Sequence, residues 1–235
     1  MDCVANVTPP MPFDFDKNSG LSGQLSTYGV YGNIGCNDCV IAARAHHTIR
    51  LVWARQKSVP YIQDPDDVIN EYHIETGNFT SCQDGLNLAD SLALWKQPPG
   101  WHYGGDPSTA HQIEDYCGPF RIDGCLLPSV PATWPTVTLD LLRAGIYIHV
   151  GAVINLVLPS TVDATDSNTF GPNHLWANMP DRDGPNHVMI LTGYDVTGSV
   201  DNFSGITWGQ KQSMTWEFLQ SHCWGVFFVE GNGST

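Results

Sequence analysis

A cysteine at the start of a predicted helix and a histidine at the start of a predicted strand are the side chains best placed for covalent chemistry. Cys39 follows Asn37 and Asp38, which are good N-cap residues, so it falls in the first helical turn. There the free backbone N–H groups and the helix dipole favour the thiolate, the nucleophilic form of cysteine. His187 begins an apolar run and is a candidate for the base that such a nucleophile needs.

The elements that must position these two residues fall into an early helical part and a late strand-rich part. Helices are predicted from residue 38 onward, after Asp64-Pro65 and over 86–95, followed by an irregular stretch over 97–135 and short helices at 139–144 and 215–221. Strands are predicted at 150–158, 187–195, 203–208 and 224–230. Helices first and strands later predict an α+β protein.

Composition excludes several classes of protein and partner. The 235 residues carry 10 Lys+Arg and 24 Asp+Glu, a net charge of −14, which argues against nucleic acid or an anionic membrane as a partner. With 42% hydrophobic and 14% charged residues, the chain is not intrinsically disordered. We find no transmembrane segment and no signal peptide in the sequence, and seven cysteines leave the redox compartment open.

The residues around Cys39 and His187 resemble those of papain-like cysteine peptidases. That family has an amide residue six positions before the nucleophile and often a cysteine three before it, as Asn33 and Cys36 are here. Its histidine is followed by apolar residues and Gly-Tyr, then by Trp-Gly, as in 193–194 and 208–209.

The sequence is most similar to uncharacterised papain-like proteins of actinobacteria and their phages, over roughly residues 27–229. The shared segments are Gly32-Asn33, Asp38-Cys39, Ala43-Arg44-Ala45-His46, Gly85-Leu86-Asn87 with Trp95, and Thr215-Trp216-Glu217-Phe218-Leu219. The resemblance implies an extended lead-in over 1–26 and a papain-like α+β domain over 27–235. In it a helical half, about 36–145, packs against an antiparallel β half, about 146–230, with a cleft between them.

The resemblance also implies a role for each matching residue. Cys39 is expected to be the nucleophile and His187 the general base, in a thioester mechanism that hydrolyses a peptide or amide bond. The Asn33 side chain and the Cys39 backbone N–H are expected to stabilise the oxyanion. Trp208 is expected to shield His187 from water. The substrate is expected to be a peptide or protein, and no cofactor or metal is needed.

Two further expectations concern a disulfide, which the resemblance implies, and a substrate surface, which the residues of the stretch over 97–135 and the loop over 159–186 suggest. Cys36 and Cys82 are candidates for a disulfide. Trp134 and Trp176, with Trp101 and Tyr103, offer aromatic surface for a substrate.

One position departs from the family pattern. The family orients its histidine with an Asn two residues before the Trp, and Ile206 occupies that position here. Because isoleucine cannot hydrogen-bond, Asn202 is the alternative candidate for the orienting residue. The missing Asn puts activity in question, although a Cys–His pair can function without a third group.

Three rival interpretations remain open. Cys36-Asn37-Asp38-Cys39 is also a C-x-x-C motif of thiol–disulfide oxidoreductases. A zinc site from Cys36, Cys39, His222 and Cys223 is conceivable, whereas His46 and His47 are expected on the helix surface. The chief rival is an inactive papain-like module for structure or binding, for example in a phage particle with assembly partners. The protein would then be incorporated in a virion, and otherwise cytoplasmic in the producing cell.

Overall fold

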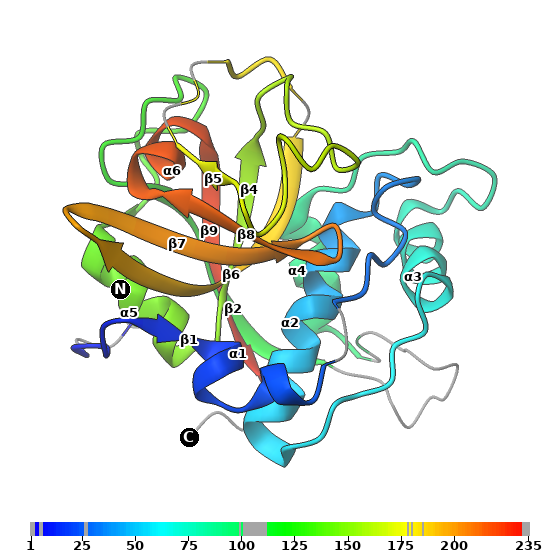
Figure 1. The fold of residues 1–235 in the computed structure, drawn as a ribbon. Coiled ribbons are helices and arrows are strands. Elements are labelled where there is room, and N and C mark those ends of the chain that lie inside the picture. Colours follow the sequence, from blue (N-terminus) through cyan, green and yellow to red (C-terminus); the bar gives the residue numbers. More distant parts are fainter. Residues whose placement is uncertain are drawn as a thin grey trace.

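The computed structural model describes residues 3–4, 7–25, 28–98, 100, 112–177, 179, 181–184 and 186–231. Its helices are α1 (Phe15–Asn18), α2 (Cys39–Gln56), α3 (Asp66–Thr76), α4 (Leu88–Lys96), α5 (Leu139–Ile148) and α6 (Trp216–His222), with a 3-10 turn η1 (Leu21–Gly23). Its strands are β1 (Phe13–Asp14), β2 (Ile113–Ile122), β3 (Thr136–Val137), β4 (Ala152–Val157), β5 (Leu175–Trp176), β6 (Asn186–Thr197), β7 (Val200–Thr207), β8 (Gln210–Thr215) and β9 (Cys223–Gly231). Helices α2 to α4 precede strands β2 to β9, so the predicted α+β class, with helices mostly before strands, is confirmed (Figure 1).

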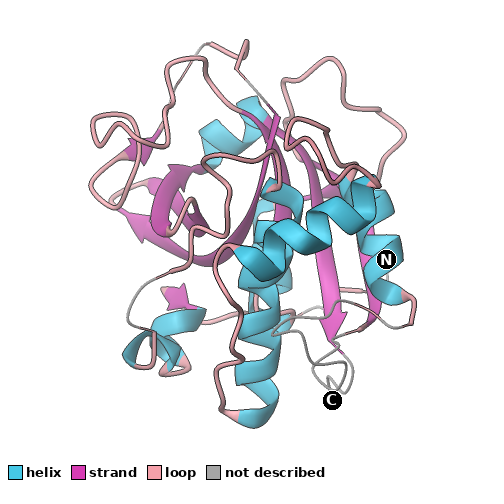
Figure 2. Ribbon diagram, turned by 90° about the vertical axis from the view of Figure 1, so that its right-hand side faces the viewer, coloured by secondary structure: helices cyan, strands magenta, loops and turns pink. Residues whose placement is uncertain are grey.

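The sheet runs in the order β3-β2-β9-β4-β6-β7-β8-β5, and β1 also pairs with β6. The pairings from β2 through β9, β4, β6 and β7 to β8 are antiparallel, while β3 and β5 pair in parallel at the two ends. Helices α2 to α4 gather beside this sheet (Figure 2). The antiparallel β half expected from the sequence is therefore present.

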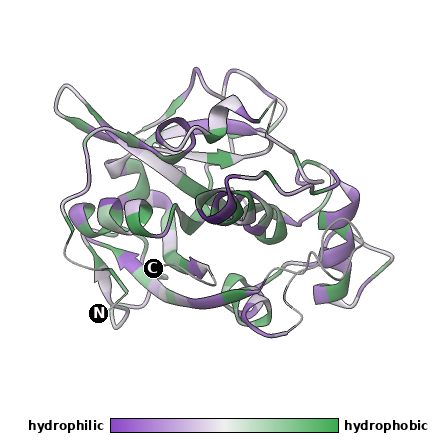
Figure 3. Cartoon of the chain, turned by 90° about the horizontal axis from the view of Figure 1, so that it is seen from below, coloured by the Kyte–Doolittle hydropathy of each residue, from purple (hydrophilic) through white to green (hydrophobic). Residues whose placement is uncertain are grey.

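Helix α2 packs between the helical half and the β half of the domain. Its apolar residues Ile41, Ala45 and Ile49 are buried, and Figure 3 shows the helix nearly end-on in the middle of the molecule with mostly hydrophobic residues around it. Two buried arginines add ionic links to neighbouring segments: Arg44 pairs with Glu71 and Glu75 on α3, and Arg50 pairs with Asp16 on α1. These contacts fix α2 against α3 and α1.

The N-terminal segment is part of the folded domain, which corrects the expected extended lead-in over 1–26. Phe13 pairs with Tyr194 of β6, and Phe13, Phe15 and Leu21 are buried in the core. A disulfide joins Cys3 to Cys117 of β2. The turn-rich composition hid this because its buried aromatic residues follow no regular period.

Five strands escaped the sequence analysis: the two-residue strands β1, β3 and β5, and the longer strands β2 and β8. β2 lies in the stretch read as irregular, because Gly118-Pro119 interrupts it and its pairing with β9 shifts register between Cys117 and Phe120. β8 is mostly polar, so its alternation was not apparent. No helix among the described residues has both the length and the apolar character needed to cross a membrane.

Candidate active site

A cleft of about 840 Å³ lies where the first turn of α2 meets the sheet. Both residues singled out for covalent chemistry, Cys39 and His187, line it, and so do Asn33 and Trp208. The structure therefore brings together four residues that the sequence spreads over about 175 positions, 33 to 208. Asn202 is not among them.

Cys39 is the first residue of α2, and its sulfur lies against strand β6. The backbone N–H of Val188, the residue after His187, hydrogen-bonds the sulfur and lowers its pKa, as the N–H groups of Val40 and Cys39 also do. Burial nevertheless dominates and raises the pKa of the Cys39 thiol to about 11, with the neighbouring Asp38 adding to the rise. The thiolate expected from the helix dipole is thus not the favoured form, because loss of hydration outweighs the N–H groups.

The N-cap residue of α2, Asp38, contributes to the raised pKa of the Cys39 thiol. Asp38 is fully buried, and neither of its carboxylate oxygens has a hydrogen-bond partner among the described residues. Burial raises the pKa of this carboxyl to about 8, and the nearby Asp64 raises it further. Asp38 occupies the N-cap position but its side chain makes no capping hydrogen bond, contrary to the expectation from its residue type.

His187 is held rigidly at the edge of the cleft. It is 4% exposed, its Nε2 lies 2.5 Å from Oγ1 of Thr207, and its ring lies 4.3 Å from that of Trp208. Burial lowers the pKa of His187 to about 3, so the imidazole is neutral. Because Thr207 occupies Nε2, Nδ1 is the ring nitrogen left for a reacting group.

A tight turn places both residues that contact His187. Thr207 pairs with Gln210 across the β7–β8 hairpin, and Trp208 and Gly209 form its two-residue loop. Both loop residues have positive φ, 45° for Trp208 and 73° for Gly209, as a two-residue turn of type I′ requires. Trp208 adopts this uncommon backbone conformation while its indole covers His187.

Comparison with solved structures places this arrangement in a known fold. Procathepsin L 3 of Tenebrio molitor larval midgut superposes with a TM-score of 0.66 at 8% identity, covering 97% of this chain and 72% of that one. Xylellain, a cysteine protease from Xylella fastidiosa, superposes with a TM-score of 0.60 at 11% identity, covering 96% and 87%. No family model matches the sequence, and no curated protein does.

The chain has a papain-like fold. A mite allergen structure described for Blo t 1 and Der p 1 is similar to the same extent, with a TM-score of 0.59 at 13% identity over 96% of this chain and 72% of that one. At these identities the likeness concerns the fold alone. What the cleft does must therefore be argued from its own side chains.

The departure at Ile206 has a structural counterpart. Ile206 is fully buried in β7 opposite Ile190, so it cannot orient His187. The alternative, Asn202, is wrong: it pairs with Asp195, far along β6 from His187, and lines a separate hollow beside Phe13 and Lys17. Thr207, one residue before the Trp, makes the contact instead. The sequence analysis missed Thr207, and the signal that could have indicated it is its hydroxyl group directly before Trp208-Gly209.

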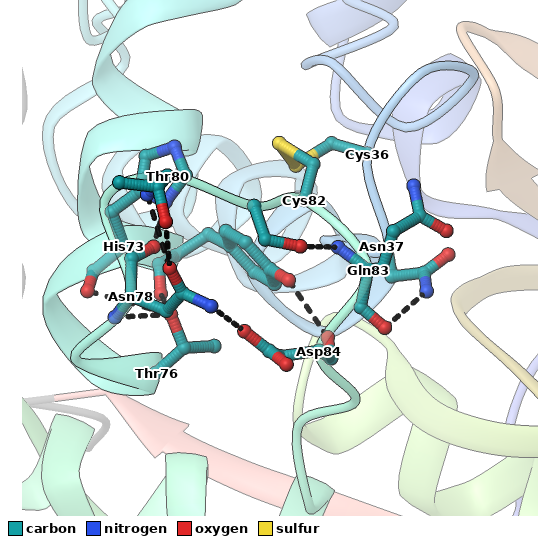
Figure 4. The surroundings of a disulfide bond; sticks show 11 residues. Cys36, Asn37, His73, Thr76, Asn78, Thr80, Cys82, Gln83 and Asp84 are labelled. Atoms are coloured by element: carbon teal, nitrogen blue, oxygen red, sulfur yellow. Dashed lines mark hydrogen bonds between the residues drawn. A yellow bond between two sulfur atoms is a disulfide. The ribbon is translucent and has the colours of Figure 1, made fainter.

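Asn33 belongs to a loop that a disulfide anchors. Cys36 and Cys82 are bonded, as the resemblance implied, and the backbone N–H and side chain of Asn37 donate to the carbonyls of Cys82 and Gln83 (Figure 4). The loop that contains Cys82 and Gln83 is in turn tied to α3 and to the residues that follow it. The Asn78 amide donates to the Asp84 carboxylate and accepts from the Thr80 N–H, and the Tyr72 hydroxyl of α3 donates to the Asp84 carbonyl (Figure 4). This network holds the Asn33 loop as one wall of the cleft.

The opposite wall comes from the sheet and is aromatic. Trp134 and Trp224 meet edge to face with ring centroids 4.8 Å apart, and Phe227 and Pro119 lie beside them. No Asp, Glu, Lys or Arg lines the cleft in the part of the chain that the structure describes. Trp134 is thus in the cleft as expected, whereas Trp176 is buried in the core against Phe218; Trp101 and Tyr103 lie outside the described residues.

The rival sites of the sequence analysis are not assembled. The C-x-x-C motif does not form a redox pair, because Cys36 is bonded to Cys82 and Cys39 is free. The conceivable zinc ligand His222 instead contacts the carbonyls of Phe218 and Asp181, and no group of three potential metal ligands occurs among the described residues. His46 and His47 are buried and not on the helix surface as expected, since α2 is covered on several sides.

Proposed function

We propose that the protein is a papain-like cysteine hydrolase that cleaves a peptide or amide bond through a thioester on Cys39. The observation that carries the proposal is the contact of the Cys39 sulfur with the N–H of Val188, the residue after His187, in a cleft that Cys39 and His187 both line. The papain-like fold supports it. A nucleophile, a base and a nearby amide donor are the parts that acyl transfer needs.

In the proposed mechanism the proton moves as the sulfur attacks. The site favours a neutral thiol and a neutral imidazole, since burial disfavours both charges. His187 Nδ1 accepts the thiol proton while Cys39 Sγ bonds to the substrate carbonyl carbon. The oxyanion that forms accepts hydrogen bonds from the Asn33 amide and the Cys39 backbone N–H.

The second half of the reaction uses the same groups. The imidazolium donates its proton to the leaving amine, and the C–N bond breaks to leave a thioester on Cys39. Water then loses a proton to His187 and attacks the thioester, which releases the acid and restores the thiol. Thr207 Oγ1 accepts a hydrogen bond from Nε2–H throughout and keeps Nδ1 directed to the sulfur.

Turnover of internally quenched peptides by three proteins tests the proposal: the unchanged chain, Cys39→Ser and His187→Ala. We expect each substitution to lower kcat/KM by at least about 1,000-fold, because nucleophile and base act as a unit. Cys125→Ser is the matched control, since Cys125 is a free, half-buried cysteine outside the cleft. Equal turnover by Cys39→Ser and the unchanged chain would overturn the proposal.

A papain-like module without catalytic activity is the second candidate, and one observation favours it. The raised pKa of Cys39 and the lowered pKa of His187 give no resting thiolate–imidazolium pair. Such a module would serve structure or binding, for instance with assembly partners in a phage particle, in line with the sequence resemblance to phage-encoded proteins. Absence of any turnover, together with Cys39 alkylation no faster than that of Cys125, would support this candidate.

A further inference from the structure

Two unbonded cysteines lie in contact outside the cleft. Cys125 follows β2, and its Sγ lies 3.9 Å from the carbonyl oxygen of Cys223, the first residue of β9. The other five cysteines of the chain are the two disulfides Cys3–Cys117 and Cys36–Cys82 and the free Cys39. Cys125 and Cys223 are therefore a third pair of neighbouring cysteines, and this pair is reduced.

Hydrogen bonds hold the turn that carries Cys125 against the end of α6. The N–H of Leu126 donates to the carbonyl of Gln220 over 2.8 Å, and the Gln220 side-chain amide donates to the carbonyl of Asp123 over 2.9 Å. Gln220 belongs to the helix that ends directly before Cys223. The backbone on both sides thus keeps the two cysteines together, and their contact does not depend on a distant segment moving in.

The two thiols differ in their access to solvent. Cys125 is half-buried, whereas Cys223 is fully buried. Burial raises the pKa of the Cys223 thiol, and the nearby Cys125 raises it further. Thiol–disulfide exchange begins with a thiolate that a dissolved disulfide can reach. Cys125 is thus the residue that reacts first, and Cys223 is the neighbour that can displace the reagent from it.

Cys223 also borders the bulge that carries Trp224. Leu156 of β4 pairs with Cys223, and Asn155 pairs with Gly225, so Trp224 is an extra residue of β9 at this point. A bulge of this kind redirects a side chain, and Trp224 lines the cleft. The Cys223 S–H donates to the Gly225 carbonyl over 3.4 Å, so this hydrogen bond joins the two neighbours of Trp224.

We propose that Cys125 and Cys223 are a redox-active dithiol that a small soluble disulfide oxidises to a third disulfide, with a shift of Trp224 in the cleft. The Cys125 thiolate attacks one sulfur of the reagent and releases the first thiolate, which takes up the proton that Cys125 lost. The Cys223 sulfur then attacks Cys125 Sγ, and the second reagent thiolate leaves with the Cys223 proton. Two electrons pass from the protein to the reagent.

Oxidation reaches the cleft through the proton of Cys223. Once its sulfur is bonded to Cys125, the S–H that donates to the Gly225 carbonyl no longer exists, and the bulge loses the hydrogen bond that spans Trp224. The inference goes beyond the proposed function, and it applies equally to an active enzyme and to an inactive module.

Alkylation of the Cys39→Ser variant tests the dithiol, because Cys125 and Cys223 are its only free cysteines. The folded protein is equilibrated at neutral pH with reduced and oxidised glutathione in varied ratios, quenched with acid, denatured and alkylated with N-ethylmaleimide. Mass spectrometry counts the labels, and peptide mapping selects the ratios at which the other two disulfides stay intact. We expect both labels to be lost together as oxidised glutathione increases, with Cys125 and Cys223 in one cross-linked peptide. Two labels at every ratio, or a glutathione adduct on Cys125 beside an alkylated Cys223, would overturn the proposal.

Two further substitutions on the Cys39→Ser background assign the reaction to the pair. Cys125→Ser should leave Cys223 alkylated at every glutathione ratio, because the reagent does not reach its buried thiol. Cys223→Ser should stop at a glutathione adduct on Cys125, since no neighbour displaces it. Loss of the Cys223 label in Cys125→Ser would contradict the pair, and this variant decides the matter even if Cys223→Ser fails to fold.

Tryptophan fluorescence tests the link to the cleft. Oxidation of the Cys39→Ser protein should change its intrinsic emission, and Trp224→Phe on the same background should lose most of that change while its thiols still oxidise. Trp216→Phe is the matched control, because Trp216 begins α6 at the end away from Cys223 and does not line the cleft. Emission that oxidation leaves unchanged, or a change that Trp224→Phe retains, would refute the shift of Trp224. No readout depends on turnover, so a failure here leaves the proposed function standing.

Discussion

The two walls of the cleft are built in different ways. The helical wall consists of the loops around Asn33 and Gln83, which a disulfide and the hydrogen bonds of Asn37 fasten together beside the start of α2. The β wall has fewer such links: His187, Asn155 and Phe227 come from three adjacent strands, and strand pairing aligns their backbones. One wall is fixed by covalent and local links, the other by register.

The difference predicts how each wall responds to the substitution of its residues. Removing the disulfide or the Asn37 hydrogen bonds of the helical wall should increase the mobility of several cleft residues together, because the two loops hold each other in place. Changing one side chain of the β wall should affect that contact alone, since backbone pairing keeps its neighbours in place.

After the Cys39 and His187 substitutions, the largest effect is expected for Asn33→Ala. Loss of one oxyanion donor typically lowers kcat about 100- to 1,000-fold, and KM should change little because the donor acts on the transition state. Peptide turnover with separate kcat and KM values measures this. Asn168→Ala removes an exposed amide in the loop before β5 and is the control. A rise in KM with an unchanged kcat would mean that Asn33 only helps to bind substrate.

Removing the Cys36–Cys82 disulfide tests whether this bond holds the helical wall in place. Cys36→Ala/Cys82→Ala should lower the free energy of unfolding by about 2–4 kcal/mol and also raise KM, since the Asn33 loop loses its anchor. Cys3→Ala/Cys117→Ala is the matched comparison, because that disulfide ties the N-terminal segment to β2. It should cost similar stability without changing KM. The measurements are urea unfolding and steady-state kinetics; equal kinetic effects of the two pairs would contradict the proposed difference.

The β wall gives a sharper single-residue test in Thr207→Val. The change keeps the shape of the side chain but leaves His187 Nε2 buried without its partner, which costs about 1–3 kcal/mol. We expect kcat to fall about 10- to 100-fold with KM nearly unchanged, and the free energy of unfolding to fall by that amount. Thr207→Ser should retain most activity because the hydroxyl remains. If the Val and Ser variants were equally impaired, packing and not the hydrogen bond would explain the contact.

The same contrast decides how much could be predicted from sequence. Asn33, Cys36 and Cys39 lie within one short segment whose capping residues mark a helix start, so the helical wall could be recognised locally. The orienting contact of Thr207 could not, because it depends on positive φ at Trp208, which a tryptophan seldom adopts. Nor could the alignment of the cleft residues of β6, β4 and β9, since it exists only through the register of these strands. The prediction of Asn202 failed for this reason.

The last effect concerns stability alone and depends on Asp38, which is buried beside Cys39 at the N-cap. Its pKa in the folded protein is raised to about 8, whereas an unfolded Asp titrates near 4. Between these values the folded state keeps a proton that the unfolded state has lost, so stability falls as pH rises from about 4 to about 8. The slope is at most about 1.4 kcal/mol per pH unit for one proton. Asp38→Asn cannot ionise and should lose that dependence.

Urea unfolding of both proteins at pH 5, 6, 7 and 8 measures the difference directly. The variant should gain stability relative to the unchanged chain as pH rises, and the gain should level off above about pH 8. A constant difference across this range would mean that Asp38 is already ionised, with a partner at its carboxylate. The negative charge would then persist beside Cys39 near neutral pH, and the thiol would face a carboxylate as well as burial in resisting ionisation.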